Sequence, residues 1–248
     1  MLDAAYFDQW YADMVTSSAR DAIITRALSL PPELSQSGVV TGPAIAEISS
    51  ELRLPPDGLL LDIACGRGGY GIEIARRADA RLIGVDFSAV AVEEAAAKGA
   101  PRSEFRVGTL VATGLATGAA DALMCLDAVQ FAEPPLAGLR EFHRLLKPGG
   151  RLALTCWEAV SAADERVPPR IRAVNLARDL PAAGFTDVRV HERPTWRAAE
   201  RSLWEAAVAA ADTDAAVRSL RAEGRRSLDT FDSLRRVFAT ATVSGSGQ

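Results

Sequence analysis

The stretch LLLDIACGRGGYGIEIA, residues 59–75, combines a leucine run, one acid and four glycines around a single cysteine. The apolar run is typical of a buried strand, and the segment after the glycines has helical spacing. Glycines at positions 66, 68 and 71 follow the G-x-G-x-x-G spacing, in which the first permits a tight turn and the second lets a ligand approach the backbone. The stretch therefore predicts a strand, a glycine loop and a helix whose N-terminus faces an anion.

From residue 59 onward, short β-rich runs alternate with helical patterns, which predicts βαβ units and an α/β fold. The predicted strands are residues 59–64, 81–86, 103–108, 121–127, 151–157, 187–193 and 235–243. Helices are expected at 69–78, 88–98, 136–146 and 172–183. We expect a single domain over 1–248, with an N-terminal helical cap at 1–58, a ligand-binding core at 59–194, a helical insertion at 195–234 and the last strand at 235–243.

Composition narrows the classes of function. The 248 residues are 48% hydrophobic and carry a net charge of −4, so the clustered basic surface of a nucleic-acid binder is not expected. No apolar run approaches a membrane span, and the acidic, aromatic N-terminus does not resemble a signal peptide. Cys65, Cys125 and Cys156 have no metal-binding spacing. The expectation is a reduced cytoplasmic protein without a metal, and its Ala- and Arg-rich composition indicates a GC-rich bacterial genome.

The glycine spacing alone does not distinguish a dinucleotide from another adenosine ligand. Asp86, twenty residues after Gly66, is suited in both cases to accept hydrogen bonds from ribose hydroxyls. Asp62 discriminates better, because a carboxylate four residues before Gly66 repels a pyrophosphate but attracts an ammonium group. S-adenosylmethionine carries an ammonium, a sulfonium and one carboxylate, and it fits this charge pattern.

The segments LLLDIACGRGGYG, LIGVDFS, ADALMCLDAVQFA and EFHRLLKPGGRLALTCWE occur in this order over roughly residues 59–160. This series resembles the ordered motifs of class I S-adenosylmethionine-dependent methyltransferases. The resemblance implies a Rossmann-like sheet of seven strands in the order 3-2-1-4-5-7-6, mostly parallel with the last strand antiparallel. The late helical insertion and aromatic N-terminus resemble the small-molecule branch of the superfamily, which includes sugar and secondary-metabolite methyltransferases.

Carried over position by position, the resemblance assigns the cofactor site. The methionine end of the cofactor would contact Asp62, Ala64, Cys65, Gly66 and Gly68, and the ribose would contact Asp86. The adenine would contact Phe87, Ser88, Gly108, Thr109 and Leu110. The methyl group would lie beside Leu126, Asp127 and Ala128. Thr109 stands where the family commonly has an acid that accepts from the adenine amino group, so a hydroxyl or backbone carbonyl must accept instead. Tyr11 is expected to close over the cofactor, because aromatic faces attract a sulfonium.

The acceptor site is less defined by the sequence. Candidate acid–base or orienting residues are Gln130, Glu158 and His191, and candidate substrate contacts are Tyr6, Trp10, Phe131, Trp157 and Trp196. Glu158 has an alternative role at a helix N-terminus, and Trp196 has one in core packing. A base helps when the nucleophile is a hydroxyl and is optional for an amine.

The expected function is in-line transfer of a methyl group from S-adenosylmethionine to an O, N or C nucleophile of a small molecule in bacterial secondary metabolism, releasing S-adenosylhomocysteine. One alternative is a noncatalytic regulatory or binding subunit that keeps the fold. Another is a nicotinamide-dependent oxidoreductase, which is disfavoured because only Lys98 and Lys147 could supply a Tyr-x-x-x-Lys motif. Alanine-rich and aromatic terminal helices leave room for a homodimer.

Overall fold

The computed structural model describes residues 4–15, 17–31, 34 and 38–245, which build a seven-stranded sheet in the order β3-β2-β1-β4-β5-β7-β6. The strands are β1 Leu59–Ile63, β2 Arg81–Asp86, β3 Ser103–Val107, β4 Ala120–Leu126, β5 Leu146–Ala159, β6 Thr186–Glu192 and β7 Leu234–Thr242. β7 runs antiparallel to both β5 and β6, whereas the other neighbours are parallel. The predicted strand order and direction are therefore confirmed.

Both faces of the sheet are covered, because alternate side chains of a strand point to opposite faces. Leu60 of β1 belongs to the hydrophobic cluster that includes helices α3 (Gly42–Leu52) and α4 (Gly69–Ala78). Leu61 belongs to the cluster beneath α6 (Pro135–Leu145) and α8 (Leu176–Ala182). Burial on both faces explains why all of β1 is apolar except Asp62.

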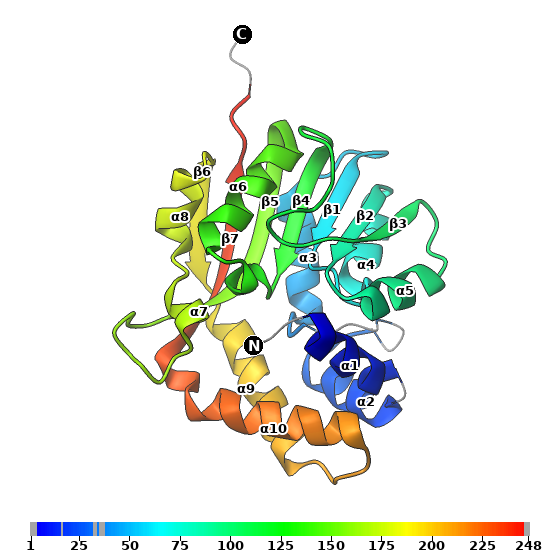
Figure 1. The fold of residues 1–248 in the computed structure, drawn as a ribbon, viewed down its shortest axis with the longest axis vertical. Helices are drawn as coiled ribbons and strands as arrows, with labels where there is room; N and C mark the ends of the chain where they lie inside the picture. Colours follow the sequence, from blue (N-terminus) through cyan, green and yellow to red (C-terminus); the bar gives the residue numbers. More distant parts are fainter. Residues whose placement is uncertain (1–3, 16, 32–33, 35–37, 246–248) are drawn as a thin grey trace.

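Four helices gather at the carboxyl ends of the parallel strands (Figure 1). They are α1 Ala4–Val15 and α2 Ser18–Ala27 from the N-terminal segment, and α9 Pro194–Ala209 and α10 Ala215–Asp229 between β6 and β7. The Ser17 hydroxyl donates to the two carboxylate oxygens of Asp214 at 3.0 and 2.9 Å, which joins segments 197 residues apart. The predicted insertion is helical and covers the end of the sheet where ligands bind in open α/β folds.

Two predicted elements differ from the observed ones by more than one residue at an end. β5 begins at Leu146, because this residue pairs with Ala120 before the strand resumes its register at Arg151. The helix expected at 172–183 is two helices, α7 (Pro169–Arg172) and α8, since the Asn175 side chain caps a new helix by accepting from Arg178 N–H. The remaining elements are α5 Ala89–Ala97, η1 Val129–Phe131 and η2 Phe231–Ser233.

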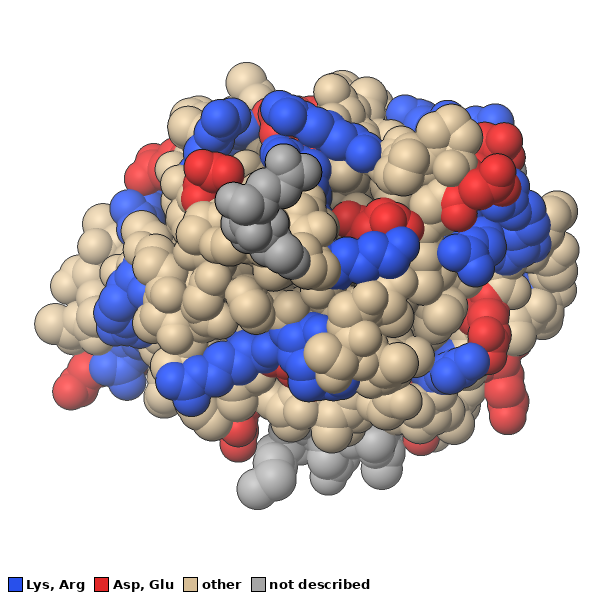
Figure 2. All heavy atoms as spheres, turned by 90° about the horizontal axis from the view of Figure 1, so that it is seen from above, with Lys and Arg blue, Asp and Glu red and all other residues tan. Residues whose placement is uncertain are grey.

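The end of the molecule away from α9 and α10 carries interspersed basic and acidic side chains (Figure 2). Lys147, for example, pairs with Asp121 at 2.7 Å. Within the described ranges, no helix has the length and apolar character needed to cross a membrane.

Candidate functional site

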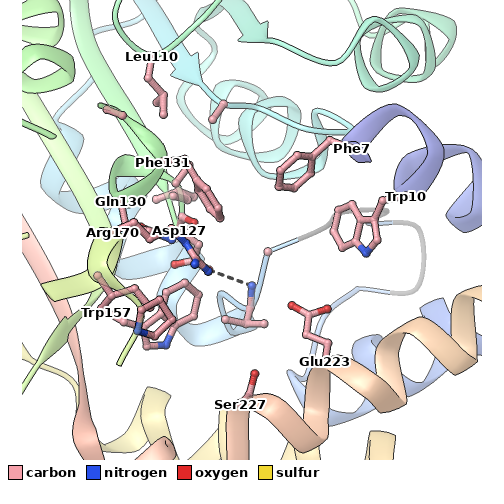
Figure 3. A pocket seen from close by; sticks show the side chains of 18 of the residues that line it. Phe7, Trp10, Leu110, Asp127, Gln130, Phe131, Trp157, Arg170, Glu223 and Ser227 are labelled. Atoms are coloured by element: carbon pink, nitrogen blue, oxygen red, sulfur yellow. Dashed lines mark hydrogen bonds between the residues drawn. The ribbon is translucent and has the colours of Figure 1, made fainter. Parts of the chain in front are cut away.

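A cavity of about 900 Å³ lies between the carboxyl ends of the parallel strands and the four gathered helices. This volume is at the upper end of the range of small-molecule sites. One part is lined by the residues that follow β1, β2 and β3, and another by β5, β7, α7, α9 and α10. Phe7, Trp10, Phe131 and Trp157 surround the open space (Figure 3). The cavity thus joins two parts with different linings.

Asp62 of β1 lies in the cavity wall with only 3% of its surface exposed. Burial, reinforced by the nearby Asp86 carboxylate, raises the pKa of Asp62 to about 8, although a hydrogen bond from the Gly71 backbone opposes the shift. A Cβ at Gly71 would lie 2.6 Å from an Asp62 carboxylate oxygen, so glycine is required there. This buried carboxyl group is suited to a cationic ligand group.

Asp86 ends β2 and organises the glycine loop. One carboxylate oxygen accepts from Gly66 N–H at 2.8 Å and the other from Ser88 N–H at 3.0 Å. Burial nevertheless raises the pKa of Asp86. The carboxylate also lines the cavity, so it connects the loop to any ligand bound there.

Most of the predicted cofactor residues line the cavity: Tyr11, Asp62, Ala64, Cys65, Asp86, Phe87, Gly108, Thr109, Leu110, Leu126, Asp127 and Ala128. Gly66, Gly68 and Ser88 are not among its lining residues. Gly68 has φ +72°, and a Cβ there would lie 2.9 Å from Phe105, so this glycine serves the turn and the packing behind it. The Ser88 hydroxyl caps α5 and donates to Asp8 at 2.5 Å.

Thr109 lies in the wall at the position that lacks the commonly found acid. Its hydroxyl oxygen accepts from Ala112 N–H at 3.1 Å and stabilises the turn after β3. The Thr109 hydroxyl can still donate a hydrogen bond to another partner.

Asp127 follows β4 and is held by several partners. Its carboxylate accepts from Val39 N–H at 3.0 Å, drawn as a dashed line in Figure 3, and from the Thr155 hydroxyl at 2.6 Å. It also pairs with Arg236. The Val40 N–H donates to the Tyr70 hydroxyl at 3.1 Å, which fixes the same N-terminal segment. With these partners, Asp127 is a structural anchor of the cavity and not a free base.

Glu200 joins two tryptophans at the base of the cavity. Its carboxylate accepts from the indole N–H groups of Trp157 at 2.9 Å and Trp204 at 3.1 Å. The Arg236 guanidinium lies 4.4 Å from the centroid of the Trp157 ring, because the two residues are paired across β5 and β7. Sequence analysis missed Glu200 and Arg236 as cavity residues. One available signal was the acid at position 200, which interrupts the apolar face of α9 midway between Trp196 and Trp204.

The aromatic residues of α1 cover the mouth of the cavity. The Phe7 ring centroid lies 5.1 Å from that of Phe87 and 5.8 Å from that of Phe131, so it bridges the two parts of the cavity. Tyr6 and Trp10 also line the cavity, and the Arg20 guanidinium lies 5.6 Å from the Trp10 ring centroid.

Among the acceptor-site candidates, the structure brings Tyr6, Trp10, Gln130, Phe131 and Trp157 to the cavity. The other three candidates, Glu158, His191 and Trp196, do not line the cavity. Glu158 accepts from Leu176 N–H at 2.7 Å, at the start of α8, and pairs with Arg235 at 2.6 Å.

His191 is exposed on the edge strand β6. Trp196 is buried against Phe238, with 5.4 Å between ring centroids. For Trp196 and Glu158 the structure therefore shows the alternative roles in packing and helix capping. Within the part of the chain that the structure describes, no cluster of His, Cys, Asp and Glu is suited to a metal ion.

Comparison with known proteins finds a family model that matches part of the chain around this cavity. Residues 61–154 match the family model described as "Methyltransferase domain", which begins in β1 and ends in β5. This chain is therefore similar to methyltransferase domains over residues 61–154. The matched segment includes the glycine loop, Asp86 and Asp127, and therefore supplies one side of the cavity.

One curated relative of known activity matches part of the chain. The ubiquinone/menaquinone biosynthesis C-methyltransferase UbiE of Geotalea daltonii is 31% identical over 111 residues, 42% of this chain and 47% of UbiE. The chain thus spans about half the length of that relative.

Two solved structures share the fold. The [4+2]-cyclase SpnF has a TM-score of 0.67 and 24% identity, covering 82% of this chain and 80% of SpnF. Phosphoethanolamine N-methyltransferase 2 of Haemonchus contortus, solved with phosphomonomethylethanolamine and S-adenosylhomocysteine, has a TM-score of 0.73 and 18% identity, covering 95% of this chain and 59% of that chain.

Proposed function

We propose that the protein is a methyltransferase that uses S-adenosylmethionine to methylate a small molecule and releases S-adenosylhomocysteine. The observation that carries this proposal is the cavity in which Ala64 and Cys65, at the start of the glycine loop, lie with Asp62 and Asp86 opposite an aromatic chamber built by other segments. One part matches the cofactor and the other leaves space for an acceptor.

The residues present fit this cofactor. Asp62 is a buried carboxyl group suited to the ammonium group, and Asp86 is placed at the end of β2 for the ribose hydroxyls. The N-terminus of α4 suits the carboxylate, while Phe87 and Leu110 offer apolar surface to the adenine. When bound, S-adenosylmethionine supplies an electrophilic methyl group on its sulfonium.

The chain's own residues would bind and orient the acceptor. Tyr6, Trp10, Phe131 and Trp157 would give it aromatic walls, and residues of α1, α9 and α10 line the same chamber. Aligning two reactants in this way can lower a barrier by about 7–11 kcal/mol. The Ala- and Arg-rich composition supports a bacterial origin, and the resemblance to the small-molecule branch of the superfamily supports a role in secondary metabolism. The three free cysteines support a cytoplasmic location. The homodimer stays a prediction.

A second candidate is a protein that keeps the fold and performs another task. SpnF, which shares this fold, is described as a [4+2]-cyclase. Under this alternative the cofactor binds but no methyl group is transferred.

The Asp86→Asn variant tests the cofactor assignment. We expect S-adenosylhomocysteine to bind at least about tenfold more weakly, because hydrogen bonds to a charged acceptor contribute about 1.5–3 kcal/mol. Isothermal titration calorimetry measures this change. Glu104→Gln is the matched control, since Glu104 is exposed on β3 and pairs with Arg106. Unchanged affinity in Asp86→Asn would refute the assignment.

A further inference from the structure

Gln130 has an unmet hydrogen-bonding group in the cavity wall. The residue lies in η1 and is 2% exposed, and its side-chain N–H donates to the Asp127 carbonyl at 2.7 Å. The side-chain oxygen of Gln130 is buried and has no partner among the described residues. Since a carbonyl can only accept, the amide nitrogen must face Asp127, and the group left over is an acceptor.

Arg170 of α7 has an unmet charge in the same wall. Its guanidinium carbon lies 5.1 Å from the centroid of the Phe131 ring, and its Nε is buried without a partner. The side chain forms no hydrogen bond or ion pair with any residue that the structure describes. By contrast, Arg197 pairs with Asp232 and Arg236 with Asp127, although both also line the cavity.

A half-buried cation without a counter-charge is costly, which makes Arg170 a donor that gains from a ligand. Burial is also the cause that lowers the pKa of this arginine.

The two groups lie close to one another. α7 contacts η1, and Figure 3 shows Arg170 and Gln130 together beside Asp127 and Phe131. Glu223 lies across the cavity in the same view. Two other carboxylates of the cavity are engaged, because Asp127 is held by three partners and Glu200 by two indoles. Glu133, which follows η1, also lines the cavity and forms no hydrogen bond or ion pair with the described residues. This part of the cavity therefore presents one donor cation and one neutral acceptor, together with the exposed Glu133 carboxylate.

We propose that Arg170 and Gln130 bind the hydroxyl group of the acceptor, and that this acceptor is an aromatic or conjugated small molecule with an acidic hydroxyl, a phenol or an enol. A hydroxyl satisfies both groups at once, since its O–H donates to Gln130 and its oxygen accepts from Arg170. A carboxylate would direct negative oxygens at the Gln130 oxygen, and an ammonium would direct positive charge at Arg170.

The rest of the wall favours an easily ionised hydroxyl on a flat frame. Arg170 favours the anionic form of the bound oxygen, whereas the Gln130 oxygen accepts from the hydroxyl and favours the neutral form. A hydroxyl that is already acidic therefore loses its proton most easily when the methyl group is transferred. The faces of Phe131 and Trp157 accommodate a planar molecule. Only the step from binding this hydroxyl to methylating it rests on the proposed function.

A matched series of probes tests the subsite: 4-nitrophenol, 4-nitroanisole, 4-nitroaniline and 4-nitrobenzoate, which differ in one group. Each is titrated by ligand-observed NMR into the full chain, with and without saturating S-adenosylhomocysteine. We expect the wild type to bind nitrophenol about tenfold more tightly than nitroanisole. The pKa of bound nitrophenol, measured from its absorbance, should be higher in Arg170→Gln than in the wild type, which a merely structural role for Arg170 would not produce.

The variants Arg170→Gln and Gln130→Leu should remove the preference for nitrophenol and leave nitroanisole binding unchanged. Arg172→Gln is the control, because Arg172 lies on the same short helix but not in the cavity wall. A preference for another probe, no binding of nitrophenol at millimolar concentration, or an unchanged preference in Arg170→Gln would overturn the inference. If S-adenosylhomocysteine binds while nitrophenol does not, the subsite fails and the proposed function stands. If S-adenosylhomocysteine does not bind, the proposed function fails.

Discussion

Asp62 is the residue whose environment says most about the ligand. Its position before the glycine loop was enough to predict an acid facing the site, because the strand and loop pattern sets its place. Its ionisation could not be predicted, since this depends on complete burial and on Asp86 from another strand. The same limit applies to Gln130, whose position in the sequence indicates the site, whereas its unpaired oxygen emerges only from the packing of η1.

The raised pKa of Asp62 predicts a proton linkage. With a pKa of about 8 the group is mostly protonated at pH 7, and an ammonium group bound beside it would favour the ionised form. Binding of S-adenosylmethionine should therefore release a proton at pH 7, and its affinity should increase from pH 6 to pH 8. Calorimetry in two buffers with different ionisation enthalpies measures the released proton.

The variant Asp62→Asn is the control for this linkage and should remove most of the proton release. Equal proton release in both proteins would contradict the assignment.

The stability of the ligand-free protein should depend on pH in the opposite direction from the affinity for S-adenosylmethionine. Its stability should decline as the pH rises from about 3.8 to about 8 and level off above that, because the unfolded carboxyl group ionises near 3.8 while ionisation of the buried one is costly.

At the scale of elements, the sequence indicated that α9 is a helix but not which of its side chains face the cavity. Its amphipathic spacing predicted a helix between the last two strands, which the structure confirms. The spacing did not reveal which tryptophan faces the cavity. Trp204 lines it and Trp196 does not, because the Glu200 carboxylate lies between them and binds Trp157 of β5 together with Trp204. A partner from a distant strand decides the role of each ring.

Replacing Glu200 tests this arrangement. Glu200→Ala leaves two indole N–H groups without their acceptor and should lower the free energy of unfolding by about 2–4 kcal/mol. Glu200→Gln keeps an acceptor oxygen and should cost less. Chemical denaturation measures both, and Glu205→Ala, on an exposed turn of the same helix, should change stability by less than about 0.5 kcal/mol. Equal stability of Glu200→Ala and Glu205→Ala would show that the indole contacts contribute nothing.

At the scale of the whole molecule, the sequence was sufficient for the sheet and insufficient for the chamber. The four ordered motifs predicted the strand order, because each motif belongs to one strand end of a known topology. The chamber depends on contacts between α2 and α9 and between α1 and α10, which join the two ends of the chain. Periodicity identifies the apolar face of a helix but not its partner. The division of the chain into a cap, a core and an insertion stays a proposal.

The central claim is that the cavity binds S-adenosylmethionine, and calorimetric titration of the unmodified protein tests it most directly. Separate titrations with S-adenosylmethionine, S-adenosylhomocysteine and NAD should give saturable binding of the first two and none of NAD. Asp62 and Asp86 are the physical reason, since they attract an ammonium group and ribose hydroxyls in a wall that disfavours a pyrophosphate. Binding of NAD without binding of either sulfur-containing ligand would contradict the account.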